Sequence, residues 1–261
     1  MTSDDSSALI GYTGFVGSNL LRQHSFDACF NSSNIEQIAG RGFDLVVCCG
    51  ARAEKWKANA EPERDLDNIE RLTRALEQVN ARKVVLISTV DVFLDPVDVD
   101  EDSPTPTTGL TAYGRNRRRL EQIVAGRFDA VIIRLVGLFG PGLKKNAIYD
   151  LLHDNNVSAI DSRGVFQYYD IGRLWGDVQL SLDHELPLVH LPTEPVSVSD
   201  VARAAFGIEF SNAVSPAPVR YDIHTRYAAL FGGVNPYLES KASTLARIAA
   251  FVATERERTP A

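Results

Sequence analysis

The stretch that decides the fold is Ala8-Leu9-Ile10-Gly11-Tyr12-Thr13-Gly14-Phe15-Val16-Gly17, near the start of the chain. Its apolar run predicts a strand over 8–10, and the apolar spacing of 15–24 predicts a helix. Glycines between a strand and a helix permit a tight turn and a close approach of backbone to a pyrophosphate. The helix start adds unpaired amides and partial positive charge. We therefore expect a dinucleotide to contact Gly11, Thr13, Gly14, Phe15, Val16 and Gly17.

Strands and helices alternate along the chain up to about residue 142. Further strands are predicted over 26–30, 43–49, 83–88 and 130–135, and helices over 63–80 and 113–125. The strand at 43–49 is almost wholly apolar, as strands covered on both faces are. The alternation predicts an α/β fold with a Rossmann-type doubly wound parallel sheet.

The regular alternation of predicted strands and helices ends after Gly142, and from there the sequence predicts a small C-terminal substrate lobe. We expect helices over 147–152, 201–210 and 240–254 and a strand over 165–169 in this lobe. Asp200 is expected to be the N-cap of the helix over 201–210. The expected divisions are a flexible N-terminus (1–7), an NAD(P)-binding Rossmann domain (8–142), a substrate lobe with returning Rossmann elements (143–254) and a tail (255–261). The Pro- and acid-rich segment 95–112 is expected to be a functional loop or lid.

Composition restricts the class of partner. The 261 residues carry a formal net charge of −7, which argues against nucleic acid and anionic membranes. Cys48 and Cys49 lie side by side in an apolar run, and the histidines lack ligand spacing, so neither a disulfide framework nor a metal site is expected. The polar, acidic start at 2–7 is unlike a secretory signal and no span-length apolar stretch occurs, so we expect a cytoplasmic protein.

The end of the second strand bears on the choice of cofactor. NAD usually meets a carboxylate about 20 residues past the glycines, at its ribose 2′-hydroxyl. Here the strand ends at Phe30-Asn31-Ser32-Ser33, with no carboxylate. Asn31 and Ser32 suit either a hydroxyl or a phosphate. We expect NAD or NADP, with NADP slightly favoured, and further cofactor contacts at Gly50 and Ala51 after the third strand.

Four motifs in order resemble the landmarks of the extended short-chain dehydrogenases/reductases, the family of nucleotide-sugar epimerases, dehydratases and reductases. They are Gly11-x-x-Gly14-x-x-Gly17, Ser88-Thr89-Val90-Asp91-Val92-Phe93, Tyr113-Gly114-x-x-Arg117, and the run from Arg134 to Gly142. The resemblance covers residues 8–142 and continues faintly through 194–202. The Val-Phe ending of the second motif and the short second strand resemble dTDP-4-dehydrorhamnose reductases.

The resemblance implies catalytic roles for Thr89, Tyr113 and Arg117. Thr89 matches the residue that bonds the reacting oxygen, and Tyr113 matches the acid/base that exchanges a proton with it. A tyrosine with an ordinary pKa near 10 needs a positive charge beside it to act as a base. The family supplies lysine one helical turn later, where this chain has Arg117, a substitution that is not conservative. Ser88, Tyr113 and Arg117 are also expected to contact the cofactor.

Departures from the family pattern restrict the expected class of reaction and of substrate. Family dehydratases carry Thr-Asp-Glu where this chain has Thr89-Val90-Asp91, so reduction or epimerisation fits better than loss of water. Gly137 stands where the family often has an asparagine that contacts substrate phosphates, which disfavours a nucleotide-diphosphate substrate. The candidate substrate residues are Asp91, Asn146, Gln167, Tyr168 and Arg173.

The sequence thus predicts an NAD(P)-dependent oxidoreductase or epimerase that acts on a keto-sugar or nucleotide-sugar by hydride transfer. One alternative is a non-catalytic NAD(P)-binding sensor or structural module, which Arg117 and Gly137 favour. A second is a reductase of a non-sugar ketone. The resemblance also implies a homodimer.

Overall fold

The computed structural model describes residues 6–106 and 108–258. The chain divides into two compact units. The first unit comprises residues 1–95, 104–134 and 172–189, and the second comprises 96–103, 135–171 and 190–261. Residues 1–5 and 259–261 of the two expected flexible ends lie outside the described residues.

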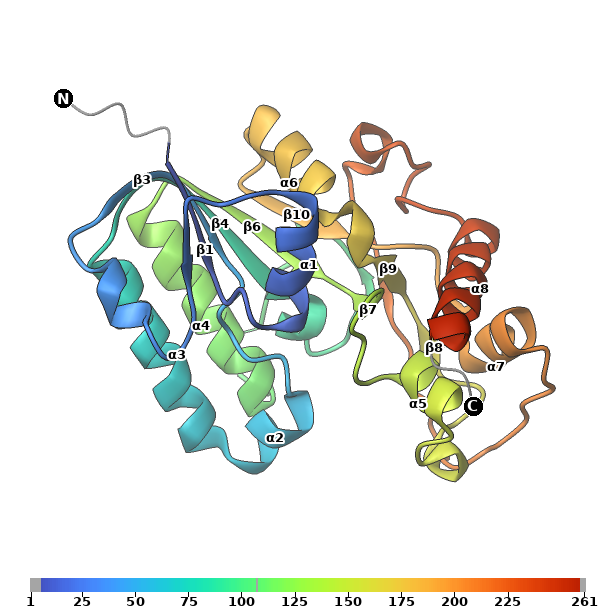
Figure 1. The fold of residues 1–261 in the computed structure, drawn as a ribbon. Helices are drawn as coiled ribbons and strands as arrows, with labels where there is room; N and C mark the ends of the chain where they lie inside the picture. The colour runs from blue at the N-terminus through green and yellow to red at the C-terminus, as the bar shows by residue number, and fades with distance from the viewer. Residues whose placement is uncertain (1–5, 107, 259–261) are drawn as a thin grey trace. The chain divides into compact units, whose positions relative to one another are not determined.

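A six-stranded sheet in the order β10-β6-β4-β3-β1-β2 forms the centre of the Rossmann part (Figure 1). Its strands are β1 (Ser7–Ile10), β2 (Ala28–Phe30), β3 (Gly42–Cys48), β4 (Asn80–Thr89), β6 (Ala130–Leu135) and β10 (Leu188–Leu191). β1 pairs in parallel with both β2 and β3, and β3 pairs in parallel with β4. The predicted Rossmann-type parallel α/β fold is confirmed.

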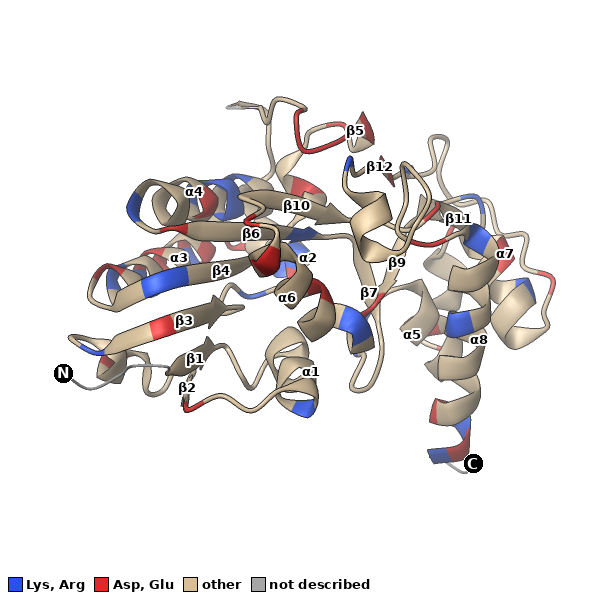
Figure 2. Cartoon of the chain, turned by 90° about the horizontal axis from the view of Figure 1, so that it is seen from above, with Lys and Arg blue, Asp and Glu red and all other residues tan. Residues whose placement is uncertain are grey.

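Helices cover both faces of this sheet. They are α1 (Phe15–Gln23), α2 (Lys55–Ala60), α3 (Pro62–Glu77), α4 (Ala112–Arg127) and α6 (Leu174–Asp183). α3 and α4 lie on one face and α1 and α6 on the other (Figure 1). Lys, Arg, Asp and Glu run along α3 and α4, whereas the strands carry few of them (Figure 2). This separation puts the charged helix faces in water and leaves the strands to the core.

The core of the first unit explains why its strands do not alternate in polarity. Val46, Cys48, Val84 and Leu86 pack with the apolar stripes of α3 and α4. Their chain neighbours Val47 and Val85 point to the opposite face and are equally buried. A strand buried on both faces reads as a continuous apolar run.

The second unit contains short paired strands and three helical segments. β7 (Gly137–Phe139) pairs with β9 (Tyr168–Asp170), β8 (Val165–Phe166) with β11 (Val196–Ser197), and β5 (Val97–Val99) with β12 (Asp222–Ile223). The helical segments are α5 (Ala147–His153), α7 (Val198–Val201) continuing as a π-helix over Ala202–Phe206, and α8 (Lys241–Arg258). Short 3₁₀ turns lie at Ile35–Ile38, Val90–Val92, Val157–Ala159, Ile171–Arg173 and Ala228–Phe231.

Two predictions for the second half were wrong in detail. Asp200 is not an N-cap: Ser197 caps α7 by accepting from the Asp200 amide at 3.1 Å, and the Asp200 carboxylate accepts from the Ser197 amide at 3.0 Å. This capping box starts the helix earlier than residue 201. The predicted strand over 165–169 is two strands, β8 and β9, because Gln167 turns inward and bonds the backbone of Thr193 and Ile223.

Other differences between the predicted and the observed elements are two short elements that were not predicted and a longer last helix. Residues 55–60, where no helix or strand was predicted, form α2, and the predicted loop over 95–112 contains β5. α8 runs to Arg258, into the expected tail. Over residues 6–106 and 108–258, the structure has no helix both long and apolar enough to cross a membrane. The same residues include no group of three or more His, Cys, Asp and Glu side chains arranged to hold a metal.

Candidate functional site

The loop between β1 and α1 is built from glycines that no other residue can replace without a shift. Gly11 has φ +88°, and a Cβ there would lie 2.5 Å from the Cys49 carbonyl oxygen. A Cβ on Gly17 would lie 2.3 Å from the Gly11 carbonyl oxygen. The start of α1 therefore packs directly onto the loop. Gly14 is the N-cap and provides no side-chain oxygen, so the first amides of α1 have no cap.

This loop lies at the point where the strand order reverses. β1 connects to β2 on one side, and the chain then crosses back from β2 to β3 on the other side of β1. The Cys49 amide donates to the Ile10 carbonyl at 2.9 Å, so the segment after β3 runs beside the glycine loop and brings Gly50 next to it. In open α/β sheets, ligands bind at the carboxyl ends of the strands at this switch point.

The end of β2 folds into a compact turn. The Asn31 side-chain oxygen accepts from the Ser33 amide at 2.8 Å and from the Ser33 hydroxyl at 2.6 Å. The Asn31 amide donates to Asn34 at 2.7 Å. Ser32 is exposed. The turn presents neutral hydrogen-bonding groups and no carboxylate.

Tyr113 and Thr89 meet at the carboxyl end of β4. Thr89 is the last residue of that strand, and Tyr113 lies in the first turn of α4, which Thr111 caps. The Tyr113 side chain is buried, and the Thr89 hydroxyl is among the groups that act on its phenol. Burial raises the pKa of the phenol above its ordinary value of 10, and the lowering effect of Arg117 does not outweigh it. The phenol thus keeps its proton at neutral pH.

The guanidinium of Arg117 forms an ion pair and hydrogen bonds with other protein groups. Only 3% of it is exposed, and it forms an ion pair with the equally buried Asp65 on α3. It also donates to the Arg52 carbonyl. Its guanidinium lies over the Tyr113 ring, 4.0 Å from the ring centroid, and its buried Nε has no partner within the described part of the chain. The predicted contact of Arg117 with a cofactor ribose stays a prediction.

Asp91 has a cationic partner that the sequence did not reveal. The Lys55 ammonium lies 2.7 Å from the Asp91 carboxylate. Four residues later on α2, the Asn59 side chain accepts from the Tyr113 amide at 3.0 Å. The i, i+4 spacing of Lys55 and Asn59 is the one available signal, and it becomes meaningful only once 55–60 is known to be helical.

Ser88 belongs to a buried network of hydrogen bonds and one ion pair with Glu121 and Arg134. Its hydroxyl donates to Glu121 at 2.6 Å, and Arg134 donates to both oxygens of the same carboxylate at 3.0 and 2.7 Å. Glu121 is fully buried and Arg134 is 2% exposed. These bonds fix β4, α4 and β6 together, and a cofactor contact by Ser88 remains a prediction.

The remaining predicted substrate residues lie elsewhere and have structural partners. Asn146 caps α5 and donates to Leu138, and the Gln167 amide bonds backbone groups. Tyr168 is buried, which raises the pKa of its phenol. These three belong to the second unit, while Arg173 belongs to the first and faces Asp177 at 3.7 Å. Their contact with a substrate is untested.

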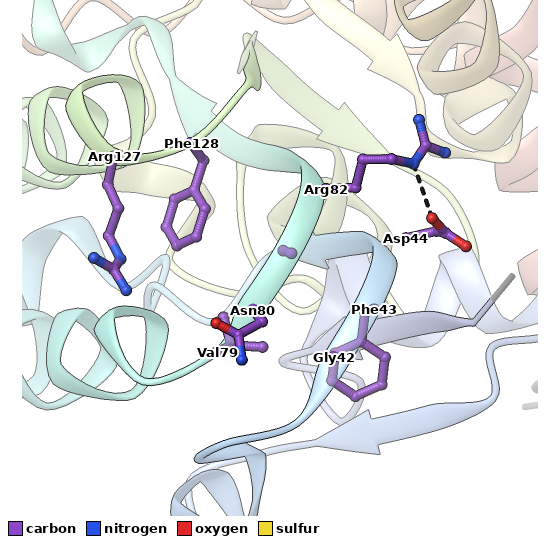
Figure 3. Close-up of a pocket in the computed structure, with 9 residues that line it drawn as sticks. Gly42, Phe43, Asp44, Val79, Asn80, Arg82, Arg127 and Phe128 are labelled. Carbon is purple, nitrogen blue, oxygen red and sulfur yellow. Dashed lines mark hydrogen bonds and ion pairs between the residues drawn. The ribbon is translucent and has the colours of Figure 1, made fainter. Parts of the chain in front are cut away.

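A hollow of about 500 Å³ lies at the amino ends of β3 and β4 (Figure 3). Its lining residues are Gly42, Phe43, Asp44, Val79, Asn80, Ala81, Arg82, Arg127 and Phe128. Because β1 and β3 are parallel, this edge of the sheet is opposite the glycine loop. It contains none of the predicted site residues and lies away from the edge where such sheets bind ligands.

Comparisons with known proteins identify the family and the fold of the chain. The sequence model of the NAD dependent epimerase/dehydratase family matches residues 24–159, a range that includes Thr89, Tyr113 and Arg117 and begins after the glycine loop. No curated protein matches the chain.

Several solved structures share the fold. The Bordetella bronchiseptica enzyme WbmG in complex with NAD is 18% identical, with a TM-score of 0.75 over 98% of this chain and 95% of that one. RMD from Pseudomonas aeruginosa complexed with NADPH is 13% identical, with a TM-score of 0.74 over 97% and 100%. A dTDP-4-dehydrorhamnose reductase from Clostridium acetobutylicum is 17% identical, with a TM-score of 0.71 over 96% and 99%.

Proposed function

Because the chain belongs to the NAD dependent epimerase/dehydratase family, we propose that it transfers hydride between a nicotinamide cofactor and a carbonyl carbon of a keto-sugar or nucleotide-sugar. One observation carries the proposal. Tyr113 is buried, the Thr89 hydroxyl is among the groups that act on its phenol, and both residues belong to the same unit as the glycine loop after β1.

The glycine loop fits the pyrophosphate of such a cofactor. The absence of side chains at Gly11 and Gly17 keeps the loop close to the strand ends, and the uncapped start of α1 leaves amides for an anion. The amides of Thr13, Phe15 and Val16 would hold the pyrophosphate, with Gly14, Gly50 and Ala51 beside it; the Gly14 amide itself donates to the Gly11 carbonyl at 3.0 Å. When bound, the cofactor supplies or accepts the hydride. The neutral turn at Asn31 and Ser32 slightly favours NADP, since no carboxylate opposes a 2′-phosphate.

Tyr113 acts as the proton donor in this proposal. As hydride reaches the carbonyl carbon, the developing oxyanion takes the phenol proton, and the product is an alcohol. Thr89 orients that oxygen. A phenol that retains its proton is prepared to act as an acid, which supports reduction of a ketone. Epimerisation needs Tyr113 to act first as a base, so we place it second.

The substrate assignment rests on the family and on Asp91. This carboxylate is partly exposed and follows Thr89 by two residues, where it can accept from sugar hydroxyls. We also propose that the protein is a cytoplasmic homodimer. A reductase of a non-sugar ketone uses the same Tyr113 and Thr89 chemistry.

A second candidate function is a non-catalytic NAD(P)-binding module. The ion pair of Arg117 with Asp65 favours it, because the charge that the family places beside the tyrosine is offset here.

Cofactor binding and turnover separate the two candidates. Calorimetric titration with NAD⁺ and NADPH should give binding heat for at least one of them. The protein should then oxidise NADPH in the presence of a nucleotide-linked 4-keto sugar, and Tyr113→Phe should abolish the rate while leaving cofactor affinity intact. Tyr149→Phe, in the second unit, serves as the control. Binding without turnover on any keto-sugar supports the sensor, and absence of binding overturns both.

A further inference from the structure

Arg117 contacts three separate parts of the first unit. It forms a buried ion pair with Asp65 of α3 and donates to the Arg52 carbonyl, in the segment that follows β3. Its guanidinium lies 4.0 Å from the centroid of the Tyr113 ring, one helical turn earlier in α4. The planar guanidinium presents several donors in a fixed geometry, so one side chain can hold several groups at once. Arg117 therefore joins α3, α4 and the segment after β3.

The segment after β3 begins beside the glycine loop. The Cys49 amide donates to the Ile10 carbonyl at 2.9 Å, and a Cβ on Gly50 would lie 3.0 Å from the Ile10 side chain. The carbonyl that Arg117 holds comes two residues after Gly50. Arg117 thus fixes the far end of a segment whose near end packs on β1, directly before the glycine loop.

Asp65 holds the guanidinium in this position. Its carboxylate accepts from Arg117 and also, at 2.8 Å, from the Asn116 side chain. Asp65 and Arg52 line the same small cavity, so the carboxylate lies beside the segment that Arg117 holds. A guanidinium keeps its charge in a protein and needs a counter-ion when it is buried. The other contacts of Arg117 therefore depend on Asp65.

A second contact binds the same stretch of chain to Tyr113. The Asn59 side chain, on α2, accepts from the Tyr113 amide at 3.0 Å. The stretch 52–59 is thus tied to Tyr113 at both ends, at Asn59 through the Tyr113 backbone and at Arg52 through the guanidinium that covers the ring.

We propose that Arg117 is a positioning residue that fixes the Tyr113 ring and the segment 50–52 relative to each other, and that it acts through these protein contacts. The inference deepens the proposed function and rests on it for the meaning of the two parts, since the ring carries the proton donor and the segment lies beside the pyrophosphate. Lysine presents a single ammonium in place of the planar fork, so it is not expected to hold both Asp65 and the Arg52 carbonyl.

ADP is the first probe, because it carries the adenosine and pyrophosphate of the cofactor but no nicotinamide ribose. Arg117→Lys keeps a cation for Asp65 and loses the hold on the Arg52 carbonyl. By calorimetry this variant should bind ADP about tenfold more weakly, the loss expected for one hydrogen bond to a charged group. A residue that acted only at the nicotinamide ribose would leave the ADP affinity at the wild-type value and weaken NADPH alone, which would overturn the proposal.

Arg119→Lys is the matched control. Arg119 lies on the same helix and also pairs with α3, at 3.2 Å from Glu70, but it is exposed. Its substitution should leave the ADP affinity unchanged. Arg117→Met with Asp65→Leu removes both buried charges, an exchange that proteins often tolerate, and should weaken ADP binding as Arg117→Lys does. Far-UV circular dichroism verifies folding, and if Arg117→Lys does not fold, the double variant takes its place.

NMR without nucleotide tests the positioning independently of the cofactor. The ¹⁹F resonance of a fluorinated tyrosine at position 113 reports on the ring, and the ¹³C resonance of the Arg52 carbonyl reports on its hydrogen bond. Arg117→Lys should shift both resonances and Arg119→Lys neither. A shift of only one resonance in Arg117→Lys would overturn the proposal. If wild-type protein binds neither ADP nor NADPH, the proposed function fails, and the two resonances still decide whether Arg117 joins the ring to the segment.

Discussion

The guanidinium of Arg117 lies over the ring of Tyr113, 4.0 Å from its centroid and one turn further along α4. A cation in this position is attracted by the face of the ring and holds the side chain in place. Its charge is opposed by Asp65, and its hydrogen bonds go to protein groups. Arg117 therefore supports the tyrosine ring as part of the packed core.

Replacing Asp65, the ion-pair partner of Arg117, should lower the free energy of unfolding. Asp65→Asn leaves a buried guanidinium without its counter-ion and is expected to destabilise the protein by about 3–5 kcal/mol. Urea denaturation provides the measurement. Asp67→Asn, an exposed position on the same helix, should change stability by less than about 0.5 kcal/mol. Equal effects of the two substitutions would contradict the importance of this ion pair.

A methyl group in the glycine loop should disturb both stability and cofactor binding. In Gly17→Ala the new Cβ meets the Gly11 carbonyl oxygen at 2.3 Å, and such overpacking costs about 1–3 kcal/mol. Binding of NAD⁺ or NADPH should weaken with it, as measured by calorimetry. Gly126→Ala, in α4 with no atom within 4 Å of its Cβ, should be neutral or stabilising by up to about 1 kcal/mol.

The pH dependence of ketone reduction should be flat through neutrality. The reaction uses the protonated phenol, and burial raises the pKa of Tyr113 above 10. The rate should therefore not fall with a tyrosine titration below pH 10. Stopped-flow measurement of NADPH oxidation from pH 6 to 10 tests this. A decline with a midpoint near neutral pH would contradict a phenol that keeps its proton through this range.

Acid should weaken the capping box of α7. Burial raises the pKa of Asp200, but the Lys241 ammonium and the hydrogen bonds from Ser197 outweigh it and hold the pKa below its ordinary 3.8. A depressed folded-state pKa contributes stability above the unfolded value, and that stability is lost as pH falls through the folded value. The stability difference between wild type and Asp200→Asn should therefore be constant above about pH 5 and shrink below about pH 4. Asp183→Asn, at an exposed position on α6, should show no such change.

The elements that the sequence predicted well share a strong local signal. The strands at 8–10, 43–49 and 130–135 are wholly or mostly apolar runs, and the α3 helix repeats Ile69, Leu72 and Leu76 at helical spacing. The short elements α2 and β5 have too few residues to show a period. Their stability comes from contacts with distant segments, such as the pairing of β5 with β12.

The stretch from Ala8 to Gly17 and the ordered motifs around Thr89 and Tyr113 determined the parallel α/β fold and the family, because strand, turn and helix preferences act over neighbouring residues. Only the tertiary structure decided which charges meet at Tyr113. Arg117 finds Asp65 across 52 residues of chain, and Lys55 finds Asp91 across 36. Such pairs form because the fold brings α2, α3, α4 and the 90–92 turn together. The free energy of an ion pair depends on distance and burial, which no local pattern specifies.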